Sequence, residues 1–128
     1  MESWLLRECA LQMMDLARAN LMMHGHVAFV VVIIDKKLSQ VPLLVETVDD
    51  DSKYRLSMML RMLAPHCHAI IILSESTVRR YNADELERDV QEGIFVDAQS
   101  PCGSFFATCT FSRNAQGDPV LNDDTALA

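Results

Sequence analysis

The sequence predicts a single α+β domain, with a mixed or antiparallel sheet of about five strands and two long helices packed on one face. The apolar run Val27–Ile34 is rich in β-branched residues and holds no Gly or Pro, which is typical of a strand buried on both faces. A second short apolar run, His68–Glu75, indicates another buried strand. Residues 3–23 and 53–63 repeat apolar side chains at helical spacing. The expected order is α-β-β-α-β-β-β.

Length and composition limit the possible classes of protein. A chain of 128 residues buries about two thirds of its unfolded surface, so one domain needs no disulfide or metal to be stable. We expect this domain to span residues 1–121, followed by a frayed acidic tail at 122–128. The net charge of −7 argues against nucleic acid as a partner, because phosphate binding needs clustered Lys and Arg. The longest apolar run is too short to cross a membrane, which takes about 20 residues.

The cysteine spacing indicates free thiols and a cytoplasmic protein. The spacings fit neither a zinc ribbon nor a Cys-x-x-Cys redox motif, and the N-terminus lacks the pattern of a secretory signal. No cofactor is implied. The four residues are Cys9, Cys67, Cys102 and Cys109.

The first helix is predicted over Ser3–Met23. Ser3 suits the N-cap, and Gly25 suits the left-handed position that follows a helix. One apolar stripe is expected to face the sheet, widened by Leu6 and Ala10. Its members are Leu5, Cys9, Met13, Leu16 and Asn20.

A hairpin and a second helix follow. The segment 38–48 is expected to return as a strand in which Pro42, lacking an N–H donor, requires an edge position, a bulge or a break. Asp49–Ser52 then supplies an N-cap with acidic residues at the positive end of the helix dipole. The helix is expected to run over Lys53–Leu63 and to stop at Ala64-Pro65.

The remaining chain is predicted to be mostly strand. Ser76–Glu92 is polar and acidic, and is read either as a short capped helix at residues 82–87 or as a surface loop. Short strands are expected at Ile94–Ala98 and Ser104–Arg113, the second with Phe105, Ala107, Cys109 and Phe111 on one face. A hairpin loop at 114–117 leads into a return strand over 119–121.

Two histidine pairs are candidate metal ligands. His24 and His26 precede one predicted strand, and His66 and His68 precede another. If these strands were parallel neighbours, four imidazoles would meet at one end of the sheet and could bind zinc or another divalent transition metal. The alternative interpretation is that the histidines occupy ordinary loop positions.

Other residues give weaker signals. Glu75, at the end of a buried run, is a candidate for acid or base chemistry, although a solvated strand end needs no such role. Cys67 between two histidines could be an activated thiol, but a small buried residue entering a strand is the simpler reading. The acidic residues of Asp84–Glu92 do not fit a calcium loop and suit a solvated face.

The expected element order resembles that of profilin-like and roadblock-type α+β domains, which usually work as dimeric scaffolds or ligand-sensing modules. Separately, the helix that begins with Met1-Glu2 and Trp4-Leu5, the Ser74-Glu75 pair and the late hairpin are similar to a group of small uncharacterised bacterial and phage proteins. In that group an aromatic residue often follows the Ser-Glu pair, where Ser76-Thr77 stands here. The second resemblance implies no known activity.

We therefore expect a non-catalytic binding or scaffold module. A homodimer is expected because the predicted helices are too few to cover both faces of the sheet. The competing hypothesis is a small metal-dependent enzyme that uses the four histidines, with Glu75 as base. A third is a regulatory protein whose acidic stretch, Asp84–Glu92, meets a basic partner.

Overall fold

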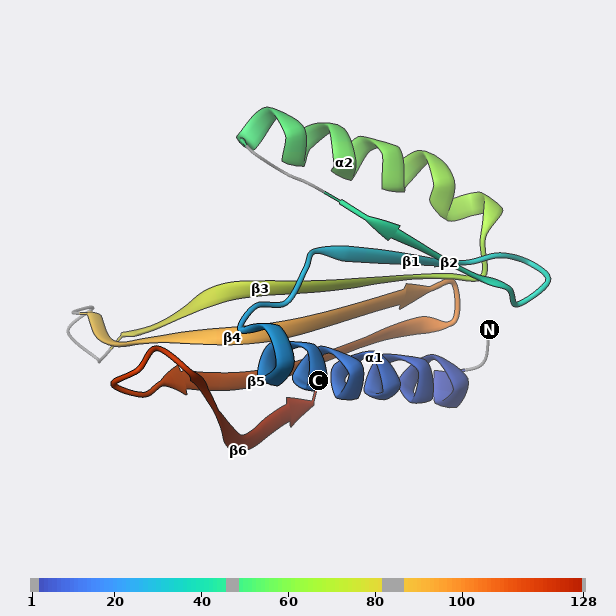
Figure 1. Ribbon diagram of the computed structural model, residues 1–128. Helices are drawn as coiled ribbons and strands as arrows, with labels where there is room; N and C mark the ends of the chain where they lie inside the picture. The colour runs from blue at the N-terminus through green and yellow to red at the C-terminus, as the bar shows by residue number, and fades with distance from the viewer. Residues whose placement is uncertain (1–2, 46–48, 82–86, 128) are drawn as a thin grey trace.

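The structure is a computed structural model that describes residues 3–45, 49–81 and 87–127. Within these ranges the chain forms two α-helices, one short 3-10 helix and six strands (Figure 1). Their bounds are α1 Ser3–His24, β1 Val30–Ile34, β2 Gln40–Leu44, α2 Asp50–Leu63, η1 Ala64–His66, β3 Ala69–Tyr81, β4 Glu87–Ser100, β5 Gly103–Arg113 and β6 Pro119–Leu127.

All six strands belong to one antiparallel sheet, with the order β2-β1-β3-β4-β5-β6. The predicted α+β class and the antiparallel alternative are confirmed. All four segments after α2 that were predicted as strands form strands, one more than the order α-β-β-α-β-β-β contains, so the sheet has six strands instead of about five. The prediction that Pro42 lies in an edge strand is also confirmed, since β2 pairs only with β1.

The two helices lie on opposite faces of the sheet, and the prediction that both cover one face is wrong (Figure 1). Alternate residues of β1 point to opposite sides. Val32 and Ile34 join the core under α1, whereas Val31 joins a smaller cluster with Leu56 and Leu60 of α2. A strand buried on both sides needs a cover on both sides, and each helix supplies one.

The buried face of α1 is rotated by one residue from the predicted five-residue stripe, toward Leu6 and Ala10, which were expected to widen it and are buried. Leu16 and Asn20 of that stripe are exposed, and its first three members are only half-buried. Ala10 and Ala17 are completely buried, so the contact with the sheet selects small side chains that allow close approach as well as large apolar ones. The buried residues of α1 are Leu6, Ala10, Met14, Ala17 and Leu21.

Three strands are longer than their local patterns predict. β3 continues to Tyr81 and β4 begins at Glu87, so most of the expected polar loop or helix at 76–92 is strand, held by pairs such as Ser76 with Gly93. Of the expected short helix, residues 82–86 lie outside the described residues. β6 runs to Leu127, and Thr125–Leu127, within the stretch expected to be a frayed tail, pair with β5 after a break in the register. Hydrogen bonds to a neighbouring strand form whatever the local polarity, which explains these extensions.

The predicted glycine after the first helix, the acidic cap of the second and its stop before Pro65 are confirmed, whereas α2 begins at Asp50 instead of Lys53 and Ser3 lies within α1. Gly25 follows α1 with a φ of 82°, and its N–H donates to Leu21 O at 2.8 Å. Asp49 caps α2, because its Oδ1 accepts hydrogen bonds from the Ser52 N–H and hydroxyl, both at 2.8 Å. These bonds lower the pKa of the Asp49 carboxyl, the backbone bond contributing most.

The tight approach of α1 to the sheet can be tested by enlarging one alanine. Replacing Ala17 with Leu should lower the free energy of unfolding by about 1–3 kcal/mol, because the core has no room for the extra carbons. Ala19→Leu, on the exposed side of the same helix, should change it by less than about 0.5 kcal/mol. Urea denaturation measures both. Equal midpoints for the two variants would contradict the packing described here.

The Asp49 cap predicts an acid-dependent loss of helix in α2. Because the folded pKa lies below the ordinary value of 3.8, the carboxylate stabilises the helix at higher pH, and this is lost as the pH falls through the folded pKa. Circular dichroism at 222 nm between pH 5 and pH 2 should show a larger loss for the native chain than for Asp49→Asn, which keeps a capping oxygen at every pH. Asp49→Ala should lose helix at neutral pH. Identical acid titrations of the native chain and the Asn variant would contradict this role.

Candidate functional site

The four candidate histidines do not meet. β1 and β3 are neighbours, as the metal hypothesis requires, but they are antiparallel, with Val30 opposite Leu73 and Ile34 opposite Ala69. His24 and His26 therefore lie at one end of this strand pair, and His66 and His68 at the other. The paired residues alone separate the two ends by about 13 Å.

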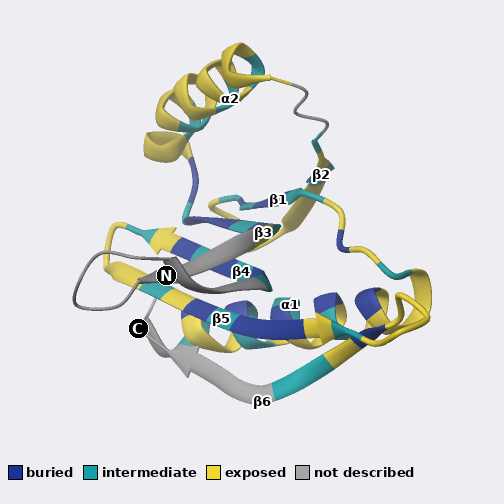
Figure 2. Ribbon diagram, turned by 90° about the vertical axis from the view of Figure 1, so that its left-hand side faces the viewer, coloured by how far each residue is buried: buried dark blue, intermediate teal, exposed yellow. Residues whose placement is uncertain are grey.

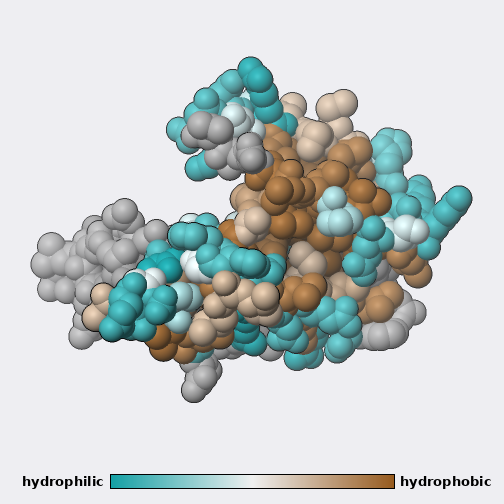
Figure 3. Space-filling view, in the orientation of Figure 1, coloured by the Kyte–Doolittle hydropathy of each residue, from teal (hydrophilic) through white to brown (hydrophobic). Residues whose placement is uncertain are grey.

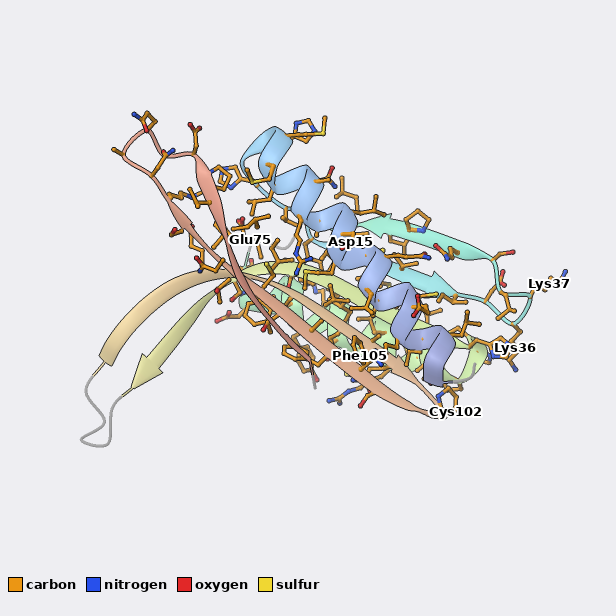
Figure 4. All side chains as sticks on the ribbon, turned by 90° about the horizontal axis from the view of Figure 1, so that it is seen from below. Asp15, Lys36, Lys37, Glu75, Cys102 and Phe105 are labelled. Carbon is orange, nitrogen blue, oxygen red and sulfur yellow. The ribbon has the colours of Figure 1, made fainter. Side chains whose placement is uncertain are left out.

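The local contacts of the histidines agree with this separation. The His68 N–H donates to Ile34 O at 2.8 Å, and its Nε2 lies 3.2 Å from Lys36 O. Figure 4 shows Lys36 and Lys37 at one end of the molecule, well away from Glu75, which lies beside His26. Within the described ranges no three His, Cys, Asp or Glu side chains gather as a metal site would require. The condition for the four-histidine site is thus not met, and the hypothesis of an enzyme built on it loses its geometric basis.

Of the candidate residues that the structure describes, His26 and Glu75 come together. His26 Nδ1 lies 3.6 Å from Glu75 Oε2, at the point where α1 ends and the chain turns toward β1. Glu75 faces α1 because it follows Ile71 and Leu73 at alternate positions in β3. Its Oε1 is buried and has no hydrogen-bond partner among the described residues. A separation of 3.6 Å is too long for a hydrogen bond, so the pair is not set for direct proton transfer.

Arg113 anchors the same end of the molecule, and no local sequence signal pointed to it. Its Nε donates to Glu92 Oε2 at 2.9 Å, its Nη2 to Gly25 O at 3.0 Å and its Nη1 to Gly117 O at 3.2 Å. The guanidinium carbon lies 5.3 Å from the centre of the Phe111 ring. The side chain thereby joins the end of α1 to β4 and to the β5–β6 turn. With three of its nitrogen atoms engaged by the protein, its role is structural.

Cys67 does not have the features of a reactive nucleophile. Its side chain is buried, and Sγ lies 3.4 Å from Leu63 O and 3.5 Å from Ala64 O, to which the thiol can donate. Burial raises the pKa of the Cys67 thiol, and the nearby Lys36 charge offsets this only in part. The protonated form is therefore favoured, as expected for a structural cysteine.

The face of the sheet opposite α1 carries the larger unfilled surface. One cleft of about 270 Å³ lies between η1 and the β4–β5 turn. A groove of about 290 Å³ crosses β3, β4 and β5. Both lie at or below the lower limit for small-molecule sites and are open to solvent, which favours contact with another surface over enclosure of a ligand. The groove is lined by Ile72, Ser74, Ser76, Phe95, Asp97 and Phe106.

Helix α2 on this face is amphipathic but buries none of its residues (Figure 2). Leu56 and Leu60 pack toward β1 and the start of β3, where they are only half-buried, as is Leu63. Its other apolar side chains are more exposed, with Tyr54 at 65% and Met62 at 73%. Methionine-rich surfaces of this kind adapt readily to a partner. The helix therefore has as many apolar side chains as a helix packed in a core, but none of them is buried.

Hydrophobic side chains also gather beneath α2, over β1 and β2 (Figure 3). On β2, Val41 pairs with Ile33, so its side chain lies on the α2 side of the sheet, where it is 44% exposed. We call the exposed side of α2, this β2 surface and the groove together the open face. It is the strongest candidate functional site in the described part of the chain.

Pro42 limits how a partner can approach β2. The Val45 N–H donates to Phe29 O and the Asp35 N–H donates to Ser39 O, so the pair Val32–Pro42 between them is one without hydrogen bonds. The nitrogen of Pro42 therefore points outward, and the free edge lacks a donor at its centre. Proline at this position discourages a further strand from adding to the sheet.

Comparisons with protein-family models, with curated proteins and with solved structures returned no match to this chain. The class that can be stated is the one defined by the fold: an α+β domain with a six-stranded antiparallel sheet between two helices. In the described ranges, neither α1 nor α2 combines the length and apolar character needed to cross a bilayer.

The anchoring role of Arg113 can be measured directly. Arg113→Ala should lower the free energy of unfolding by about 1–3 kcal/mol, because it removes charge-assisted bonds to Glu92 and to two carbonyls. Arg113→Lys should recover only part of this, since an ammonium cannot reach three acceptors in a fork. Arg55→Ala is the matched control, because its exposed ion pair with Asp51 is worth less than about 0.5 kcal/mol. Chemical denaturation that ranks Arg55→Ala as the more damaging change would refute the assignment.

Proposed function

We propose that this protein is a non-catalytic binding or scaffold module that acts as a homodimer. The observation that carries the proposal is α2, a 14-residue helix with no buried residue. Burying one large apolar side chain contributes roughly 1.5–3 kcal/mol, so a partner over this helix supplies the stabilisation that the single chain leaves unused. Contiguous exposed apolar surface of this kind marks an interaction site.

The polar groups support a binding role over a catalytic one. Arg113 and Glu92 are bonded to each other and to the fold, His26 and Glu75 are too far apart for a hydrogen bond, and the Cys67 thiol favours its protonated form. These contacts stabilise the chain and assemble no reactive group.

The proposed partner is protein, in this case a second copy of the chain. A net charge of −7 is unfavourable for phosphate backbones. We further propose that the protein acts in the cytoplasm. All four cysteines lie in described segments and are free thiols, as a reducing compartment favours.

The proposal predicts that the native chain sediments with twice the chain mass at micromolar concentration. Replacing both Met58 and Met62 by Glu should weaken the dimer by about 30-fold or more, because two charges then have to be buried at the contact. Analytical ultracentrifugation over a concentration series measures the dissociation constant.

The matched control is Met23→Glu, which changes an even more exposed methionine on α1, at 75% exposure. It should leave the dimer unchanged, and circular dichroism should show native helix content in both variants. A native chain that remains monomeric at 100 micromolar would overturn the homodimer.

A further inference from the structure

Two parts of the open face, α2 and the groove, lie side by side on the same side of the sheet. α2 covers the β1–β3 part, through the cluster that includes Val31 and Ile70. The groove lies over β3, β4 and β5, where no described helix packs. Ile72 belongs to both, since it packs against the α2 cluster and also lines the groove. The apolar surface therefore continues from the underside of α2 into the groove.

The outer side of α2 and the groove have complementary chemistry. Tyr54, Met58 and Met62 recur every four residues and project away from the side that holds Leu56 and Leu60. The groove offers the Phe95 and Phe106 rings, whose centres lie 5.9 Å apart. Thioether and aromatic groups pack favourably against each other.

Charge adds a second match. Asp97 lines the groove and is the register partner of Phe106, and its Oδ1 accepts one hydrogen bond from Gln99 Nε2 at 2.8 Å. Arg61 projects from the exposed side of α2, and no ion pair with a described residue engages it. The Asp97 carboxylate on the groove and the Arg61 guanidinium on α2 are therefore complementary in charge.

Two-fold symmetry allows both matches to form at once. In a dimer with the open faces opposed and the axis parallel to the strands, rotation exchanges the two halves of each face. The α2 of each chain then lies over the β4–β5 half of its partner. Each helix becomes a shared layer, packed on its own sheet by leucines and on the partner's sheet by Tyr54, Met58 and Met62.

We propose that the outer side of α2 from one chain occupies the Phe95–Phe106 groove of a second copy, with Arg61 pairing across the interface with Asp97. This rests on the proposed homodimer and specifies its interface. Contact through the sheet faces also agrees with Pro42, which disfavours pairing of two β2 edges.

Charge reversal tests the proposed pair. Arg61→Glu and Asp97→Lys should each weaken the dimer by about ten-fold, and the double variant, which restores opposite charges at both symmetry-related contacts, should recover most of the loss. Lys37→Glu and Asp118→Lys are matched controls, because both residues are exposed and lie outside the open face. They should leave the dissociation constant within about two-fold of the native value.

A disulfide trap supplies an independent measurement. Met58→Cys combined with Phe106→Cys, in a chain whose exposed Cys102 is Ser, should form a covalent dimer on mild oxidation, and each single cysteine variant should form far less. Charge rescue together with this cross-link supports the proposal.

The outcomes separate the two proposals. A native dimer that neither charge reversal weakens and that the cysteine pair does not trap would place the interface elsewhere, overturning this inference and leaving the homodimer intact. A native chain that is monomeric at 100 micromolar would overturn both.

Discussion

The burial of β1 on both faces is the constraint on which the rest of the structure depends. Val31 is fully buried on one side and Val32 nearly so on the other, while β2 and β3 flank the strand in the sheet. A strand without a polar face cannot lie at the surface of a two-layer protein. The chain therefore has to cover both faces, and it has two long helices with which to do so.

The two covers differ in quality, and this difference underlies the functional proposal. α1 lies close against the sheet, with Ala10 and Ala17 at the contact and larger side chains around them. α2 lies over the edge half of the other face and buries no residue of its own. One face of the sheet is thus fully packed, whereas the other has an apolar helix beside an unfilled groove. A second chain supplying the missing layer would make the two faces equivalent in packing.

The polar end of the molecule shows how distant contacts set the role of a residue. Arg113 ends an ordinary alternating strand, and its sequence neighbours give no hint that it contacts Gly25, 88 positions away. Glu75 and His26, distant in the sequence, are neighbours because β1 and β3 run antiparallel. The same antiparallel pairing moved His66 and His68 to the far end. Strand direction decided which candidates could act together, and it is not encoded in the residues next to them.

Local patterns by themselves determined the two helices, the Asp49 and Gly25 caps, the buried character of β1 and β3 and the inward face of β5, and they limited β2 to an edge, a bulge or a break. These features depend on interactions within a few residues: apolar periodicity, the Asp49 cap, the missing donor of Pro42 and Gly25 after the end of α1. Tertiary structure alone decided that the helices lie on opposite faces, that β3, β4 and β6 extend through polar residues, and that α1 presents its alanines. Those outcomes depend on hydrogen bonds and close packing between segments far apart in the chain, whose free energy outweighs local preference.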